Sequence, residues 1–151
     1  MLSWYWRSFD ELSKAELYEL LALRQEVFTL EQKVNENDLD FLDFKAIHLL
    51  GKSDEKLVAY LRLFPVGHKY PDSVSFGRVL IAENFRGLGL AKKMMAETLL
   101  YLEKIKNTSP VCISAQSYLE KFYQSYGFET TGSVYDEAGI PHVKMIKQPG
   151  E

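Results

Sequence analysis

An arginine and two closely spaced glycines, Arg86, Gly87 and Gly89, stand where an apolar run ends and a long amphipathic segment begins. Glycines at such a strand-to-helix turn let backbone N–H groups approach a ligand closely, because no side chain is in the way. The helix N-terminus that follows offers unpaired N–H donors and partial positive charge. The spacing therefore predicts an anion site, and in particular a phosphate site, at this turn.

Two familiar phosphate-binding patterns do not fit the turn. A P-loop needs a glycine, four residues and then Gly-Lys-Ser/Thr, and neither Gly87 nor Gly89 meets that spacing. A dinucleotide-binding loop needs Gly-x-Gly-x-x-Gly, and Lys92 stands where its third glycine belongs. Arg86, Gly89 and Ala91 fit the pattern Arg/Gln-x-x-Gly-x-Gly/Ala better. Two glycines alone are also compatible with a tight structural loop.

A second motif, Phe-Tyr-x-x-x-Gly-Phe at residues 122–128, follows a predicted strand and opens in a short predicted helix. The two motifs in this order resemble the GNAT (GCN5-related N-acetyltransferase) superfamily. The resemblance extends over nearly the whole chain to its ElaA-like group. The segments that carry it are residues 23–32, 40–43, 57–60, 77–79, 122–128 and 139–142.

The resemblance implies an α/β chain with the GNAT acyl-CoA N-acyltransferase fold, a mixed central sheet of about six to seven strands flanked by about four helices. One domain would span residues 1–151. The implied activity is N-acetyl transfer, in which a primary amine of an unidentified small molecule or peptide attacks the co-substrate acetyl-CoA directly. The alternative is a non-catalytic acyl-CoA-binding or regulatory module. The presence of both the Arg86 motif and Tyr123 favours the enzyme.

The same resemblance implies the residues of the donor site. Backbone amides of the loop would hold the CoA pyrophosphate, and the strand before it would pair with the pantetheine. These residues are Val79, Leu80, Ile81, Arg86, Gly87, Leu88, Gly89, Leu90, Ala91 and Lys92. Tyr123 stands where the superfamily often has the acid that protonates the leaving thiolate. Its alternative is a core tyrosine whose hydroxyl bonds to backbone.

The acceptor site is less defined by the sequence. Four residues are candidates for contacting or deprotonating the amine: Glu31, Gln32, Arg78 and His142. An ordinary histidine pKa of about 6.5 suits a base at neutral pH, although deprotonation through water is an equal option. A basic row of His48, Arg62 and Arg78 on three successive strands would either bind substrate or pair with Glu31, Asp40 or Asp43 in a structural ion network.

Periodicity and turn residues predict the elements that position these groups. Ser13 and Glu16 have capping-box spacing, so a helix begins there, and Glu31 shares its inward face if the helix continues that far. Residues 35–43 are expected to be a solvated acidic loop. Strands are predicted at 3–9, 46–51, 57–64, 73–81, 111–115, 128–134 and 142–146, and further helices after Gly89 and at 118–126, with a loop at 135–141.

Composition and net charge limit which further partners, compartments and cofactors the sequence allows. With 151 residues and a formal net charge of −3, the chain has no basic field that would attract nucleic acid or an anionic membrane. A single cysteine, Cys112, suits a reducing compartment, and no long apolar run or signal-peptide pattern is evident, so we expect a cytoplasmic protein. The three histidines lack ligand spacing, so no metal is expected. A monomer and a homodimer are both compatible with the sequence.

Overall fold

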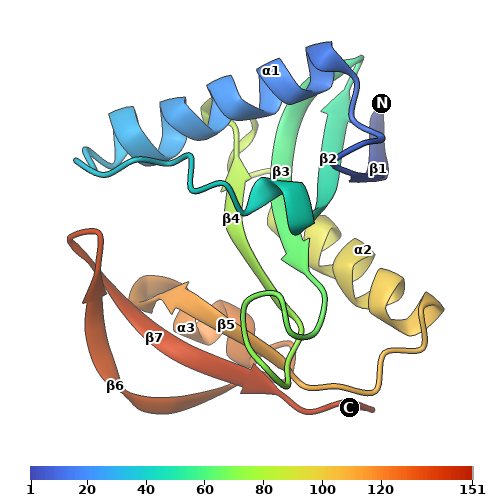
Figure 1. The fold of residues 1–151 in the computed structure, drawn as a ribbon. Coiled ribbons are helices and arrows are strands. Elements are labelled where there is room, and N and C mark those ends of the chain that lie inside the picture. Colours follow the sequence, from blue (N-terminus) through green and yellow to red (C-terminus); the bar gives the residue numbers. More distant parts are fainter. Residues whose placement is uncertain (151) are drawn as a thin grey trace. The chain divides into compact units, whose positions relative to one another are not determined.

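The structure is a computed structural model that describes residues 1–150, in which seven strands and three α-helices follow one another in the predicted order (Figure 1). The mixed α/β class and the number of strands are as predicted. The strands form two sheets, of four and three strands, and there are three α-helices where about four were expected. Contacts divide the chain into two compact units. The first comprises Met1–Leu63 and Arg78–Asn107, and the second comprises Phe64–Gly77 and the described chain from Thr108 onward.

The four-stranded sheet has the order β1-β2-β3-β4, with β1 at Leu2–Ser8, β2 at Ile47–Ser53, β3 at Lys56–Phe64 and β4 at Ser75–Ile81. The first three strands pair antiparallel. Asp54 and Glu55 join β2 to β3 with φ of +49° and +70°, which is the two-residue turn that matches the twist of a hairpin. The predicted hairpin is therefore present.

Helix α1, Lys14–Arg24, begins at the predicted capping box, where Ser13 and Glu16 bond to each other's backbone N–H. It continues as a π-helix over Gln25–Glu31. The wider π turns move the positions after Arg24 off the 3.6-residue period. Glu31 is therefore partly exposed to solvent, and the expectation that it lies on the buried face was wrong.

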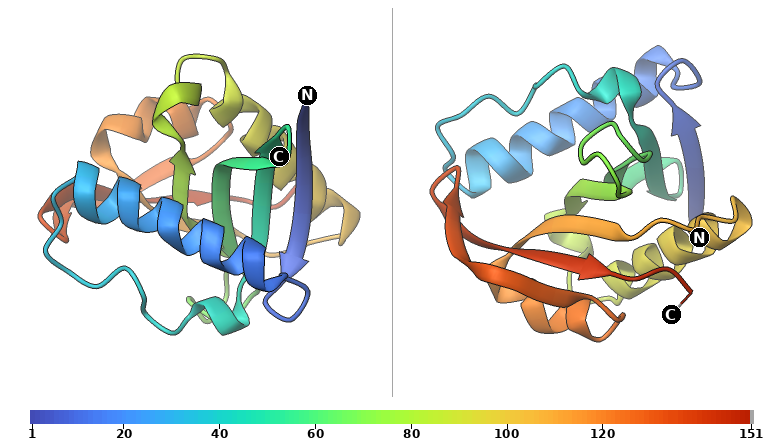
Figure 2. Two further views of the ribbon diagram at one scale, coloured as in Figure 1. Left: turned by 90° about the horizontal axis from the view of Figure 1, so that it is seen from above. Right: turned by 60° about the horizontal axis from the view of Figure 1, so that its bottom comes forward.

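Helices α1 and α2, the latter at Leu90–Lys104, lie on opposite faces of the four-stranded sheet (Figure 2). Neighbouring residues of β1 point to opposite faces, as a strand requires. Tyr5 packs against the apolar cluster that Leu20 of α1 joins, whereas the ring of Trp6 stacks on Tyr101 of α2 at 4.3 Å between centroids. The sheet thus packs against α1 with one face and against α2 with the other.

The second unit contains an antiparallel sheet of order β5-β7-β6, with β5 at Val111–Gln116, β6 at Glu129–Glu137 and β7 at Ile140–Lys147 (Figure 2). The predicted loop at 135–141 was too long. Ala138 and Gly139, with φ of +55° and +81°, make a two-residue turn, and Asp136 accepts a hydrogen bond from the Gly139 N–H (3.2 Å). Tyr135 and Glu137 consequently belong to β6.

Aromatic packing forms the core of this second unit. Helix α3, Glu120–Gln124, is shorter than predicted because residues 117–119 form a 3₁₀ turn, and Gly127 (φ +93°) follows its end. Its Tyr123 contacts Phe76 and Phe128 at 6.1 and 5.8 Å between ring centroids. Val74, just before β4, forms a parallel bridge with Val111 at the start of β5.

Candidate functional site

The loop before α2 has the geometry of an anion site. Gly87 and Gly89 both adopt the left-handed region, with φ of +78° and +80°, and a Cβ placed on either would meet nothing within 4 Å. Gly89 is the N-cap of α2, and the first hydrogen bond of the helix runs from the Lys93 N–H to the Gly89 carbonyl (3.3 Å). The N–H groups of the helix before Lys93 precede the helical hydrogen-bond ladder, so they have no partner within the helix itself.

Arg86 is anchored beside this loop. Its Nε donates to the carbonyl of Ile81 (2.9 Å), and its NH2 group bonds to Glu31 Oε2 (2.8 Å). The Arg86 side chain is 44% exposed and that of Glu31 27%. The structure thus brings Arg86, which was predicted to bind acetyl-CoA, into contact with Glu31, which was predicted to contact the acceptor amine.

The strand that leads to the loop offers its backbone rather than its side chains. β4 is the last strand in the order of its sheet, so one of its edges has no partner within that sheet. The side chain of Leu80 is buried in the apolar cluster with Leu20 and Tyr60, so only its main chain is available to a ligand. Leu90 is buried in the same way, whereas Leu88 is 61% exposed.

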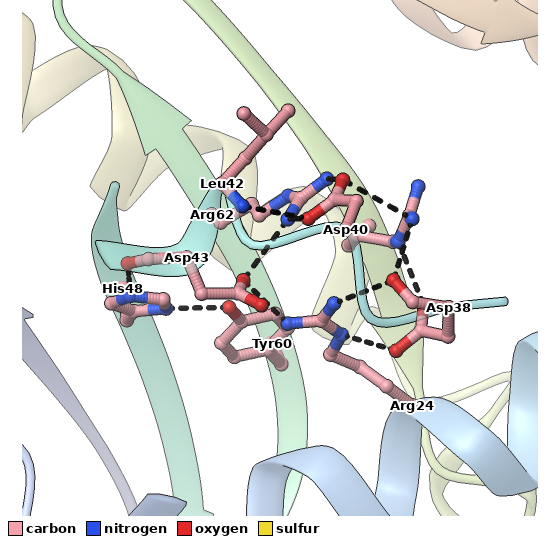
Figure 3. A network of polar contacts seen from close by, with 9 residues as sticks. Arg24, Asp38, Asp40, Leu42, Asp43, His48, Tyr60 and Arg62 are labelled. Carbon is pink, nitrogen blue, oxygen red and sulfur yellow. Dashed lines mark hydrogen bonds and ion pairs between the residues drawn. The ribbon is translucent and has the colours of Figure 1, made fainter. Parts of the chain in front are cut away.

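Three arginines and three aspartates form a network in the first unit (Figure 3). Arg24, fully buried, bonds to Asp38 Oδ2 (2.9 Å) and Asp43 Oδ1 (2.7 Å). Arg62 bonds to Asp40 Oδ2 (2.5 Å) and Asp43 Oδ1 (3.0 Å). The expectation of a solvated acidic loop was therefore wrong for these three aspartates, because buried cations require carboxylate partners.

Arg78 joins the network from β4. Its φ is +51°, unusual for a residue with a side chain, and its Nε bonds to Asp38 Oδ1 (2.7 Å). The NH2 group of Arg78 also lies 3.5 Å from Asp40 Oδ2. The basic row of His48, Arg62 and Arg78 was expected either to bind substrate or to form a structural ion network. The observed contacts are those of the ion network.

The electrostatics of the network keep its carboxylates ionised. Burial alone would raise the pKa of Asp43, but hydrogen bonds and positive charge from Arg24 and Arg62 hold that pKa below its ordinary value. The pKa of Asp40 is lowered in the same way by Arg62 and the Leu42 N–H, against the effect of burial.

His48 completes the network as a neutral ring. Its Nε2 lies 3.0 Å from the Asp43 carbonyl, which can only accept, so Nε2 carries the hydrogen. The Tyr60 hydroxyl then donates to Nδ1 (2.6 Å). Burial lowers the pKa of His48 below its ordinary value. His48 therefore fixes Asp43 in place rather than facing a ligand.

Tyr123 lies in the second unit and is 3% exposed. Its ring packs among aromatic neighbours, and burial raises the pKa of its hydroxyl above the ordinary value. Within residues 1–150 that hydroxyl makes no hydrogen bond. Tyr123 is therefore a core tyrosine, as in the alternative, but without the bond to the backbone that the alternative included. At neutral pH the Tyr123 hydroxyl is therefore protonated, and its O–H donates to no group within residues 1–150.

His142 in the second unit belongs to a polar cluster on β5, β6 and β7. Its Nδ1 lies 2.7 Å from the Ile140 carbonyl, and its Nε2 lies 3.4 Å from Glu137 Oε2. Glu137 Oε1 accepts from the Ser114 hydroxyl (3.1 Å), which also bonds to the Tyr135 hydroxyl. The Tyr135 ring stacks on His142. The cluster stands beside an open hollow of about 560 Å³, lined by Tyr70, Thr131, Gly132, Ser133, Tyr135, Glu137 and Lys144.

The predicted site residues therefore divide between the two units. The loop before α2, Glu31, Gln32 and Arg78 lie in the first, and Tyr123 and His142 lie in the second. Gln32 ends the π-helix, where its N–H donates to the Val27 carbonyl (3.2 Å). The polar cluster around His142 went unpredicted because residues 135–141 read as a loop. The signal for it was the alternation of Tyr135 with Glu137, and of His142 with Lys144, about a turn-forming glycine.

Among residues 1–150, none of the helices combines the length and the apolar character that a membrane span requires. That same part of the chain contains no cluster of three or more His, Cys, Asp or Glu residues arranged to hold a metal ion.

Comparison with known proteins identifies the class. The acetyltransferase (GNAT) domain family matches residues 25–149. A UPF0039 protein of Synechocystis sp. is 40% identical over 146 residues, which cover 96% of this chain and 94% of that protein. An acyl-CoA N-acyltransferase from Pseudomonas aeruginosa has a crystal structure with a TM-score of 0.92 and 38% identity, covering 97% of this chain and 99% of that one.

The chain therefore belongs to the GNAT acetyltransferase family, and its fold is the acyl-CoA N-acyltransferase fold. The crystal structure of Escherichia coli ElaA has a TM-score of 0.91 and 36% identity, covering 98% of this chain and 100% of that one. Within the family the chain falls in the ElaA-like group, as the sequence predicted. Acyltransferases of this family use CoA thioesters, so the loop before α2 is the candidate donor site.

Proposed function

We propose that this chain, as one GNAT domain over residues 1–151, transfers an acetyl group from acetyl-CoA to a primary amine. The observation that carries the proposal is the loop before α2, where Gly87 and Gly89 are left-handed and the space above them is open. Backbone N–H groups there suit the CoA pyrophosphate, with Arg86 and Lys92 adding positive charge. The free edge of β4 at Val79, Leu80 and Ile81 suits the pantetheine amides.

The proposed chemistry is direct attack. A neutral amine attacks the thioester carbonyl, the tetrahedral intermediate collapses with cleavage of the C–S bond, and the thiolate takes a proton. Tyr123 supplies that proton from its O–H group, in support of which its hydroxyl is protonated and makes no hydrogen bond within residues 1–150. The proton lost by the attacking ammonium goes to a base, for which His142 and water are the candidates.

A glycine pair tests the donor site. Gly89→Ala adds a methyl group at φ +80° in the loop, and Gly67→Ala adds one at φ +87° elsewhere with equally open surroundings. Both variants carry similar backbone strain, of about 1 kcal/mol. By calorimetry with acetyl-CoA, Gly89→Ala is expected to lose about tenfold or more in affinity, while Gly67→Ala keeps the wild-type affinity. Equal affinities in the two variants would remove the loop from the donor site.

A tyrosine pair tests the enzyme against the non-catalytic module. Tyr123→Phe removes a hydroxyl that bonds to nothing in residues 1–150, so stability and acetyl-CoA affinity should hold. Thiol release with an active amine is expected to fall about tenfold or more, since a positioned acid contributes about 10²–10⁴-fold. Tyr126→Phe, in the same motif, is the control and should keep the wild-type rate. An absence of thiol release in the wild type over a broad amine panel, with acetyl-CoA bound, would favour the module.

A further inference from the structure

The first strand, β1, leaves one edge of the four-stranded sheet open. β1 is the first strand in the order of its sheet, so only one of its two edges has a partner there (Figure 2). All seven of its residues are partly exposed, and it pairs with β2 without a register shift. Natural sheets protect such an edge with proline, lysine or a bulge, because unpaired backbone groups otherwise recruit another strand. β1 has none of the three.

The backbone groups that β1 directs outward follow from its pairing with β2. The Asp54 N–H donates to the Met1 carbonyl (3.4 Å), which continues by one residue the register that pairs Leu2 with Ser53. Hydrogen-bonded and non-hydrogen-bonded pairs alternate along an antiparallel ladder. The odd-numbered residues of β1 therefore bond to β2, and the even-numbered residues direct their N–H and C=O groups outward.

Contacts at the end of β1 agree with this assignment. The Ser8 N–H donates to Glu11 Oε1 (2.8 Å), and the Ser8 carbonyl accepts from the Glu11 N–H (3.1 Å), so both groups of Ser8 face away from β2. The Trp6 carbonyl accepts from the NH1 group of Arg7 at 3.5 Å and retains a second lone pair. The turn after β1 thus satisfies the last outward position and leaves the earlier ones open.

The open positions are Leu2, Trp4 and Trp6. Within residues 1–150 both outward groups of Leu2 and Trp4, and the N–H of Trp6, have no partner. A second, antiparallel copy of β1 supplies those partners at one register, in which Trp4 pairs with Trp4 of the second copy and Leu2 with its Trp6. Each pair exchanges two hydrogen bonds. A two-fold axis at Trp4 therefore satisfies every open group, and Ser8, already bonded to Glu11, lies outside the pairing.

The side chains of β1 favour the same register. Trp6 stacks on Tyr101 of α2, and alternation along the strand puts Leu2 and Trp4 on that same face. The Trp4 ring covers Gly51 of β2, where a Cβ would lie 2.5 Å from the ring. At the two-fold axis the two Trp4 rings would be direct neighbours. Cross-strand aromatic pairs of this kind stabilise antiparallel strands.

The other open strand edges are less suited to a second copy. β6, the outer strand of the second sheet, loses its register with β7 between Thr131 and Tyr135 and carries Glu129, Asp136 and Glu137. An interrupted and acidic edge disfavours pairing with a copy of itself. β4, at the other end of the first sheet, is the strand proposed for the pantetheine. Of these three strands, β1 alone is regular and unassigned.

We propose that two copies of this chain associate through β1, antiparallel and with Trp4 on the two-fold axis, so that their four-stranded sheets join into one sheet. The partner is thus a second copy of this chain. The interaction uses neither the loop before α2 nor β4, so it stands independently of the proposed acetyl transfer.

Hydrogen exchange tests the pairing on the unaltered protein. Sedimentation over about a hundredfold range of concentration should show monomers converting to dimers. The amides of Trp4 and Trp6 should exchange about tenfold or more slowly in the dimer than in the dilute monomer. Those of Ser3 and Tyr5, already in the ladder with β2, should change far less. A monomer at every concentration, or a dimer in which Trp4 and Trp6 exchange as fast as in the monomer, would overturn the proposal.

Opposite charges at position 4 test the two-fold register. Trp4→Lys and Trp4→Glu each place like charges directly opposite one another across the axis, so each variant alone should be monomeric. An equal mixture of the two should dimerise. Tyr18→Lys and Tyr18→Glu, at a residue of α1 that is 80% exposed, are the matched controls and should dimerise as the wild type does.

Circular dichroism and urea unfolding establish that the position 4 variants are folded. A folded Trp4→Lys that still dimerises alone, or a folded mixture that stays monomeric, would overturn the proposed pairing. If the variants do not fold, the exchange rates of Trp4 and Trp6 in the wild type decide the question by themselves.

Discussion

The charge network of the first unit and the hollow of the second both contain basic and acidic side chains. They differ in how many of these charges have a partner within the protein. In the network, Arg24, Arg62 and Arg78 each bond to aspartates, and the central cation is fully buried. In the hollow, Lys144 has no ion-pair partner in residues 1–150, and the half-exposed Glu137 lies 3.4 Å from Nε2 of His142. Paired charges define a structure, whereas charges left open are available to a ligand. Burial of a charge is thus a poor guide to function unless its partners are counted.

The largest expected effect comes from breaking the closed network. Arg24→Met leaves Asp38 and Asp43 partly buried with one cation fewer, so we expect a loss of about 3 kcal/mol in the free energy of unfolding. Urea unfolding measures it. The control is Arg7→Met, which removes a half-exposed arginine 3.7 Å from Glu16 and should cost less than about 1 kcal/mol. Equal losses in the two variants would mean that burial does not distinguish them.

A smaller effect follows from the pH dependence of the same network. Burial lowers the pKa of His48 in the folded state, so its contribution to stability is complete above about pH 6.5 and declines as the pH falls toward the lower folded value. Between pH 6.5 and 5.5 the loss should reach up to about 1 kcal/mol. The lowered pKa values of Asp40 and Asp43 add a separate loss only below about pH 4.

Replacing His48 with glutamine separates the loss of stability that begins at about pH 6.5 from the loss that begins at about pH 4. His48→Gln retains one donor and one acceptor for the Asp43 carbonyl and the Tyr60 hydroxyl without titrating. Urea unfolding of this variant should show little change between pH 6.5 and 5.5. A decline as steep as that of the wild type would assign the titration to another group, of which His142 in the second unit is the first to test.

How far the sequence predicted these two regions depended on whether the signal was local. The capping box at Ser13, the glycines before α2 and the β2–β3 hairpin are local patterns, and each was correctly predicted. Arg24 could be placed on the apolar stripe of α1, but its pairing with Asp38 depends on the path of an irregular loop that no periodicity encodes. The π-helix after Arg24 gives no sequence signal either, and it changed the environment of Glu31.

The loop before α2 and the hollow of the second unit also differ in whether a local sequence pattern predicts them. The loop proposed to hold the donor is one contiguous segment, so the sequence could predict its residues as a set. The structure gives Gly87 and Gly89 the left-handed backbone that glycine allows. The hollow brings Tyr70 and Lys144 together from distant segments, and only the structure revealed it. Arg78 shows a third case, since its charge was visible in the sequence but its left-handed backbone and its contact with Asp38 were not.

The smallest expected effect concerns the ion pair between Glu31 and Arg86. Its charges are paired, as in the network, but they are partly exposed, as in the hollow. Both side chains are partly exposed, so Glu31→Gln should change the free energy of unfolding by less than about 0.5 kcal/mol. Arg86 retains its bond to the Ile81 carbonyl and loses only the carboxylate. With that negative charge gone, acetyl-CoA affinity by calorimetry should rise by about two- to fivefold at low salt, and the gain should shrink as salt is added. Weaker binding in Glu31→Gln would mean that the carboxylate holds Arg86 in the orientation that receives the donor, rather than competing with it.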